Sequence, residues 1–133
     1  DVAMRVRSTD PKVMAKMQET LLSPEWMAAH PAHMAKMAEA ALHPIPPHAQ
    51  KLHYQASEGH DSWDLLPTIT APTLVIHGSA DLVNMTANAP LLAARITGAE
   101  LYIVPGGRHL FFVEFQAESS RVVKDFFTRH PLI

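Results

Sequence analysis

The sequence predicts an α/β protein in which a helical segment precedes a unit of alternating strands and helices. In residues 1–62, apolar side chains recur at helical spacing between prolines. In residues 63–133, one short apolar run ends at Gly78 and a second ends at Pro105-Gly106-Gly107, as expected of buried parallel strands, and each is followed by a helical stretch. We therefore expect two parts, 1–62 and 63–133, with a β-α-β-α order of parallel strands in the second.

Length, charge and composition bound the function. A chain of 133 residues with 47% apolar residues can bury the core of one modest domain. A net charge of -2, with no apolar run near the roughly 20 residues of a membrane span, predicts neither a nucleic-acid nor a membrane partner. The chain has no cysteine, which excludes disulfides, thiolate metal sites and cysteine catalysis within it. This composition fits a cytoplasmic protein.

Prolines divide the first part into three expected helices. The first begins after Asp10, a good capping residue followed by proline, and ends at Ser23-Pro24. A turn over residues 25–30 then leads to the second helix after Pro31. The third helix is expected over about residues 48–57.

The second part contains two predicted strands, 73–77 and 100–104. A helix over about residues 86–96 joins them, and a last helix covers about residues 114–128. Because parallel strands end at the same edge of a sheet, functional side chains are expected in the loops that follow them.

One ionisable residue stands in each of these loops, Asp81 after the first strand and His109 after the second. If the strands are neighbours, the two side chains can meet. A carboxylate that accepts a hydrogen bond from an imidazole fixes its tautomer and stabilises the imidazolium that forms on proton uptake. Taken singly, Asp81 could merely cap a helix and His109 could bond to backbone, but their placement at successive strand ends favours a catalytic acid and base.

Residues 71–81 and 99–114 resemble the penultimate strand with its acid turn, and the last strand with its histidine loop, of the α/β-hydrolase fold superfamily. The resemblance covers roughly residues 63–127. It implies that Asp81 is the acid and His109 the base of a catalytic triad. It also implies that residues 1–62 form a helical cap segment and residues 63–133 the C-terminal part of the hydrolase core. The implied activity is hydrolysis of an ester, lactone or related acyl bond in a small molecule, without cofactor or metal.

The sequence departs from that family at several points. Asn84 stands where proline is frequent, and Arg108 stands where glycine often precedes the histidine, which puts the geometry of the histidine loop in question. The family's nucleophile sits in a G-x-S-x-G elbow upstream of the acid. No serine of this chain has that frame; they are Ser8, Ser23, Ser57, Ser62, Ser79, Ser119 and Ser120. We therefore expect the nucleophile upstream of this chain, and the isolated chain to be inactive.

Two other interpretations remain. Two parallel strands make a small sheet with an unpaired edge, so the chain could instead be a non-catalytic binding module that self-associates through that edge. The 9 histidines also raise the question of a metal site. Because they are spread over several helices without an H-E-x-x-H pattern, we expect no metal.

Overall fold

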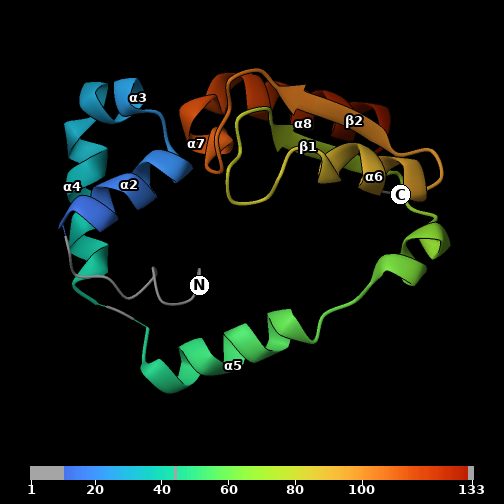
Figure 1. Ribbon diagram of the computed structural model, residues 1–133. Helices are drawn as coiled ribbons and strands as arrows, with labels where there is room; N and C mark the ends of the chain where they lie inside the picture. Colours follow the sequence, from blue (N-terminus) through green and yellow to red (C-terminus); the bar gives the residue numbers. More distant parts are fainter. Residues whose placement is uncertain (1–10, 44, 132–133) are drawn as a thin grey trace.

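The computed structural model describes residues 11–43 and 45–131, so the expected capping residue Asp10 lies outside the described residues. Figure 1 shows a helical segment, an outlying helix and a layered α/β unit. In chain order the elements are α2 (Pro11–Leu21), α3 (Pro24–Ala29), α4 (Pro31–Ala41), α5 (Pro47–Glu58), the 3-10 helix η1 (Trp63–Thr68), β1 (Leu74–Gly78), α6 (Asn88–Arg95), β2 (Glu100–Val104), α7 (Phe111–Glu114) and α8 (Gln116–Arg129).

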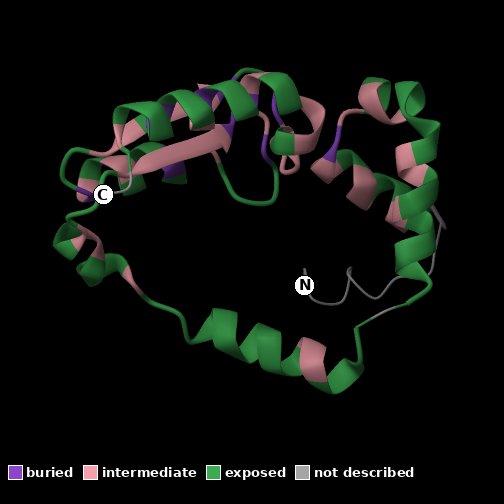
Figure 2. Ribbon diagram, turned by 180° about the vertical axis from the view of Figure 1, so that it is seen from behind, coloured by how far each residue is buried: buried purple, intermediate pink, exposed green. Residues whose placement is uncertain are grey.

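The α/β unit has the expected β-α-β-α order. Strands β1 and β2 pair in parallel, from Leu74 opposite Glu100 to Gly78 opposite Val104. Helix α6 connects them and contacts both strands, while α8 packs on β2 from the other face of the sheet (Figures 1 and 2). The buried apolar residues of this unit come from both helices and from the sheet: Ala89, Ile96, Val104, Val122 and Phe126. The fold class predicted for the second part is thus confirmed.

The structure corrects one expected element and adds another. Residues 25–30 were expected as a turn, but Pro24–Ala29 form helix α3, because the Ser23 hydroxyl caps it by accepting a hydrogen bond from the Trp26 N–H at 3.2 Å. The last helix, expected over about residues 114–128, is α8. The short helix α7, which was not expected, precedes it, and Phe115, with φ -111° and ψ 45°, separates the two.

The helical segment is sparsely packed within this chain. Among the described residues before η1, Leu22 alone is buried, at 1% exposure. Helix α5 lies apart from the α/β unit, and its Leu52 and Tyr54 are 61% and 51% exposed (Figure 2). None of the helices in the described ranges is long and apolar enough to cross a bilayer. The core of the chain therefore sits in the α/β unit.

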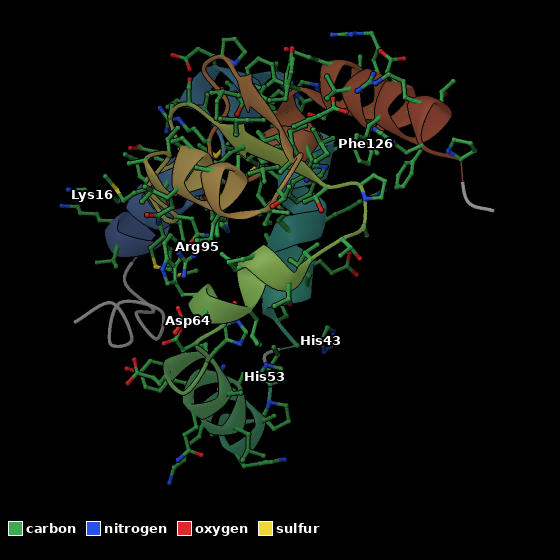
Figure 3. All side chains as sticks on the ribbon, turned by 90° about the vertical axis from the view of Figure 1, so that its right-hand side faces the viewer. Lys16, His43, His53, Asp64, Arg95 and Phe126 are labelled. Atoms are coloured by element: carbon green, nitrogen blue, oxygen red, sulfur yellow. The ribbon has the colours of Figure 1, made fainter. Side chains whose placement is uncertain are left out.

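An exposed contact joins η1 to α6 of the α/β unit. Arg95, in the last turn of α6, donates a hydrogen bond to Asp64 at 3.1 Å and lies 4.9 Å from the centre of the Trp63 ring (Figure 3). Since exposed ion pairs contribute about 1 kcal/mol or less, this contact orients η1 more than it stabilises the fold.

At the carboxyl end of the sheet, the backbone of Gly78 lies directly against that of Gly107. A Cβ atom on Gly78 would stand 2.2 Å from the Gly107 carbonyl oxygen, and one on Gly107 would stand 2.7 Å from Phe111 Cβ. Hydrogen bonds join the same two loops, from Ala80 N–H to Gly107 O at 2.8 Å and from Ser79 N–H to Val104 O at 3.0 Å. The loops that follow β1 and β2 are therefore held together backbone to backbone.

This contact predicts that Gly78→Ala lowers the free energy of unfolding by about 3 kcal/mol, because the methyl group meets backbone atoms that cannot rotate away. Urea denaturation of the wild type and the variant measures the change. Gly59→Ala is the matched control. Its new Cβ would lie 3.5 Å from Gln55 O in a helical backbone, so its stability should stay level or rise by up to about 1 kcal/mol. Equal denaturation midpoints for the two variants would contradict the steric argument.

Candidate active site

Asp81 is a buried carboxylate held in place by its own loop. It follows β1 by three residues and is 5% exposed. Its Oδ1 atom accepts hydrogen bonds from the N–H groups of Val83 at 2.8 Å and Asn84 at 2.9 Å. Such a turn, in which a carboxylate binds the backbone two and three residues ahead, fixes the side chain and leaves Oδ2 for another partner.

His109 is that partner. Gly106, with φ +74°, makes the sharp turn after β2 that a residue with a side chain rarely adopts, and its N–H donates to Ser79 Oγ at 2.7 Å. Two residues beyond the Gly78–Gly107 contact, His109 Nδ1 lies 3.0 Å from Asp81 Oδ2. The structure thus brings together the two residues that the sequence singled out.

The geometry assigns the tautomer of His109. An ionised carboxylate only accepts hydrogen bonds, so Nδ1 must carry the proton that it shares with Asp81. Nε2, on the opposite side of the ring, then holds a lone pair when the imidazole is neutral. The His109 side chain is 30% exposed, whereas that of Asp81 is 3% exposed. The pair therefore presents an accessible base backed by a buried acid.

The surroundings of Asp81 favour its charged form. Burial raises the pKa of Asp81, but hydrogen bonds from His109 and from the N–H groups of Val83 and Asn84 outweigh that effect and hold its pKa below the ordinary value. The carboxylate is thus ionised at neutral pH and can stabilise positive charge on His109.

A second imidazole lies close to the acid. His77 Nδ1 is 3.0 Å from the Gly78 carbonyl oxygen, so this nitrogen carries a proton, and Nε2 stands 3.7 Å from Asp81 Oδ2. That separation exceeds a hydrogen bond. His77 therefore borders the acid turn, while His109 makes the direct contact.

The described residues contain no group of three His, Cys, Asp or Glu side chains placed to hold a metal ion. Two of the histidines instead pack on Trp26: His30 stacks with ring centres 4.0 Å apart, and His33 meets its edge at 5.0 Å. His43 and His53 lie on separate segments of the helical part (Figure 3).

The histidine loop also contacts the corner between α2 and α3, a feature that the sequence analysis missed. Leu110 N–H donates to Leu21 O at 2.9 Å, and Arg108 donates to the carbonyl oxygens of Glu19 and, at 3.4 Å, Leu22. Glu114 accepts hydrogen bonds from the hydroxyl and N–H of Ser23. The Ser23-Pro24 pair is a common helix start that the sequence shows, but Glu114, which binds Ser23, lies 91 positions away along the chain.

A shallow depression lies at the opposite end of the strands. Its lining includes Leu74 and Glu100, the first residues of β1 and β2, together with Tyr102, Arg121 and Asp125. Neither Asp81 nor His109 borders it. It is thus separate from the candidate active site.

No protein-family model matches the chain, but curated proteins are similar to part of it. A putative non-heme chloroperoxidase of Synechocystis is 46% identical over 50 residues, which are 37% of this chain and 18% of that protein. A curated relative, the mouse (Mus musculus) serine hydrolase BPHL, is 35% identical over 72 residues, which are 54% of this chain and 25% of that protein. This chain thus spans about a quarter of that relative's length.

Solved structures match nearly the whole chain. The enol-lactonase of Burkholderia xenovorans LB400 superposes with a TM-score of 0.72 at 24% identity, over 95% of this chain and 48% of that one. Est816, described as an N-acyl homoserine lactone degrading enzyme, gives a TM-score of 0.67 at 27% identity, over 93% of this chain and 50% of that one. The element order, the paired loops and these likenesses agree: the chain has the fold of the α/β-hydrolases and corresponds to a C-terminal portion of that fold.

Proposed function

We propose that this chain supplies the acid and base of a hydrolase that cleaves an ester, lactone or related acyl bond in a small molecule. The observation that carries the proposal is the 3.0 Å contact between His109 Nδ1 and Asp81 Oδ2, made by an accessible imidazole and a buried carboxylate. In the same proposal, residues 1–62 are the cap segment and residues 63–133 the core.

The chemistry follows from the tautomer. As a nucleophile attacks the carbonyl carbon, His109 Nε2 takes its proton, and Asp81 stabilises the resulting imidazolium. Nε2 then gives this proton to the departing alkoxide. In the second half, Nε2 takes a proton from water as the water attacks the acyl group, and returns it to the nucleophile. The net change is ester plus water to acid plus alcohol, which needs no cofactor.

The nucleophile is assigned to a position upstream of this chain. In the described part of the chain, the hydrogen bond of His109 to a side chain is the one with Asp81. The Ser79 hydroxyl, close by in sequence, accepts from the Gly106 N–H and serves to join the two loops. In proteins of the α/β-hydrolase fold, the nucleophilic elbow precedes the acid and base. The chain alone is therefore proposed to be inactive.

The substrate class rests on the relatives and on the charge balance. Est816 is described as degrading a lactone, and the mouse relative is named a serine hydrolase. The net charge of -2 offers no strong attraction to nucleic acid or to an anionic membrane. We propose that the substrate is a small neutral ester or lactone. We also propose that the reaction takes place in the cytoplasm, because a chain without cysteine has no disulfide that reducing conditions could break.

The test is hydrolysis of a chromogenic short-chain ester, by this chain and by the product of the complete reading frame that encodes it. Asp81→Asn and His109→Ala should each lower kcat of the latter by about 10³- to 10⁴-fold, as loss of a triad member does elsewhere. Asp125→Asn and His60→Ala, both at exposed positions, are the matched controls and should keep full activity. Full hydrolysis by the 133-residue chain would refute the upstream nucleophile, and unchanged kcat in both site variants would refute the acid–base pair.

The lowered pKa of Asp81 has a consequence for stability. A carboxyl group with a lower pKa in the folded than in the unfolded state adds stability above its unfolded pKa of about 3.9, and this is lost as pH falls through the folded value. Urea denaturation from pH 7 to pH 2 should therefore show a smaller loss of stability in Asp81→Asn than in the wild type. Parallel curves for the two proteins would contradict the ionised, hydrogen-bonded carboxylate.

A second candidate role concerns the sheet edge. Within the described residues, β1 pairs with β2 alone. Thr73 O and Ser79 N–H bond toward β2, so by alternation the N–H groups of Leu74 and Ile76 point to the unpaired edge. We infer that a second copy of the chain pairs there, which would also serve a non-catalytic, self-associating module.

Sedimentation velocity across a range of concentrations tests this pairing. The 133-residue chain should shift from monomer to dimer, and the N–H groups of Leu74 and Ile76 should gain protection from hydrogen exchange as the dimer forms. The Val75 N–H, which faces β2, is the internal control and should be protected at all concentrations. A clean monomer with sharp cooperative unfolding would count against the pairing.

A further inference from the structure

We propose that Arg108 and Glu114 are positioning residues that fasten the loop carrying His109 to the corner between α2 and α3. The placement of the base then depends on the helical segment as well as on the sheet. This inference rests on the proposed function for its catalytic meaning. The contacts themselves are a property of the folded chain and can be tested without any activity.

Arg108 acts on the end of α2. The last four carbonyl groups of a helix have no partner within the helix and carry partial negative charge. Arg108 donates hydrogen bonds to the Glu19 carbonyl, one of these four, and to the Leu22 carbonyl just beyond α2, at 3.4 Å. The Leu110 N–H donates to the Leu21 carbonyl at 2.9 Å. A guanidinium and a backbone N–H from either side of His109 thus occupy the carboxyl end of one helix.

Glu114 acts on the start of α3. Its carboxylate accepts hydrogen bonds from the hydroxyl of Ser23 and, at 3.4 Å, from the Ser23 N–H. The same hydroxyl accepts from the Trp26 N–H at 3.2 Å and so caps α3. A negative charge at the amino end of a helix is stabilised by the exposed N–H groups there. Each of the two charges in the histidine loop therefore matches the helix end that it contacts.

The five hydrogen bonds come from residues on both sides of the base along the chain. Arg108 directly precedes His109, Leu110 directly follows it, and Glu114 ends the short helix α7 that continues the loop. Figure 1 shows α7 lying beside the α2–α3 corner. Leu22, at the centre of that corner, is buried at 1% exposure. A displacement of α2 and α3 must therefore move the loop or break these contacts.

Arg108 also explains the departure from the family pattern. Glycine at this position would give the loop more freedom but no side chain. Here the long side chain reaches helix α2, and His109 Nδ1 still lies 3.0 Å from Asp81. The substitution thus adds a contact to the helical segment without loss of the acid–base pair.

Hydrogen exchange and histidine nitrogen spectra of the folded 133-residue chain test the proposal. In Arg108→Ala and in Glu114→Ala, exchange of the Leu110 N–H should accelerate about tenfold, because each change removes a charge-assisted contact. The His109 Nδ1 signal should shift in the direction expected for an imidazole whose hydrogen bond to the Asp81 carboxylate is weaker. Arg121→Ala, which removes an exposed arginine paired with Asp125, is the matched control and should alter neither signal.

Conservative variants keep the test decisive if an alanine variant does not fold. Arg108→Lys keeps the charge, and Glu114→Gln keeps an accepting oxygen. In each, the Leu110 N–H should exchange at least threefold more slowly than in the corresponding alanine variant, at a rate about threefold above that of the wild type. In the product of the complete reading frame, Arg108→Ala and Glu114→Ala should lower kcat about tenfold with KM little changed. If Arg108→Ala and Glu114→Ala give the same exchange rates and nitrogen signals as Arg121→Ala, the positioning role is overturned, even if hydrolysis is found. Accelerated exchange without hydrolysis in any form would instead leave the role standing and refute the hydrolase.

Discussion

The rest of the site depends on the close approach of Gly78 and Gly107. With glycine at both positions, the loop after β1 reaches the loop after β2 at backbone distance, and a hydrogen bond from Ala80 N–H to Gly107 O at 2.8 Å fixes the approach. Asp81 lies three residues beyond one glycine and His109 two residues beyond the other. A side chain at either glycine would separate the loops, and the carboxylate and imidazole would lose a contact of 3.0 Å.

Once the loops are joined, the electrostatics follow from the arrangement of hydrogen bonds. Asp81 is buried, which by itself disfavours charge, yet two backbone N–H groups and one imidazole N–H point at its oxygens. The carboxylate therefore remains ionised without exposure to water. A buried charge of this kind acts strongly on a neighbouring ring, because little solvent lies between them. His109 receives its orientation from a group that cannot rotate.

Much of this could be predicted from the sequence, since the deciding signals are local. Both strands, the helices that follow them, and the placement of Asp81 and His109 at one edge are consequences of apolar runs that end in glycine. Helices α3 and α7 were missed because helices of six and four residues leave little periodicity. The contacts of Arg108 and Glu114 were missed for another reason. They join residues about 90 positions apart, and nothing local marks the pairing.

Those distant contacts add a second support for the loop that carries His109. A parallel sheet positions the ends of its strands, but a loop beyond the strand end gains rigidity only from what it touches. Here the loop touches the sheet through Gly107 and the helical segment through Arg108, Leu110 and Glu114. Helix α5, by contrast, is largely exposed within this chain. The α2–α3 corner is therefore the part of the helical segment whose movement would displace the acid–base pair. The movement would be transmitted by the contacts of Arg108 with the end of α2 and of Glu114 with the start of α3.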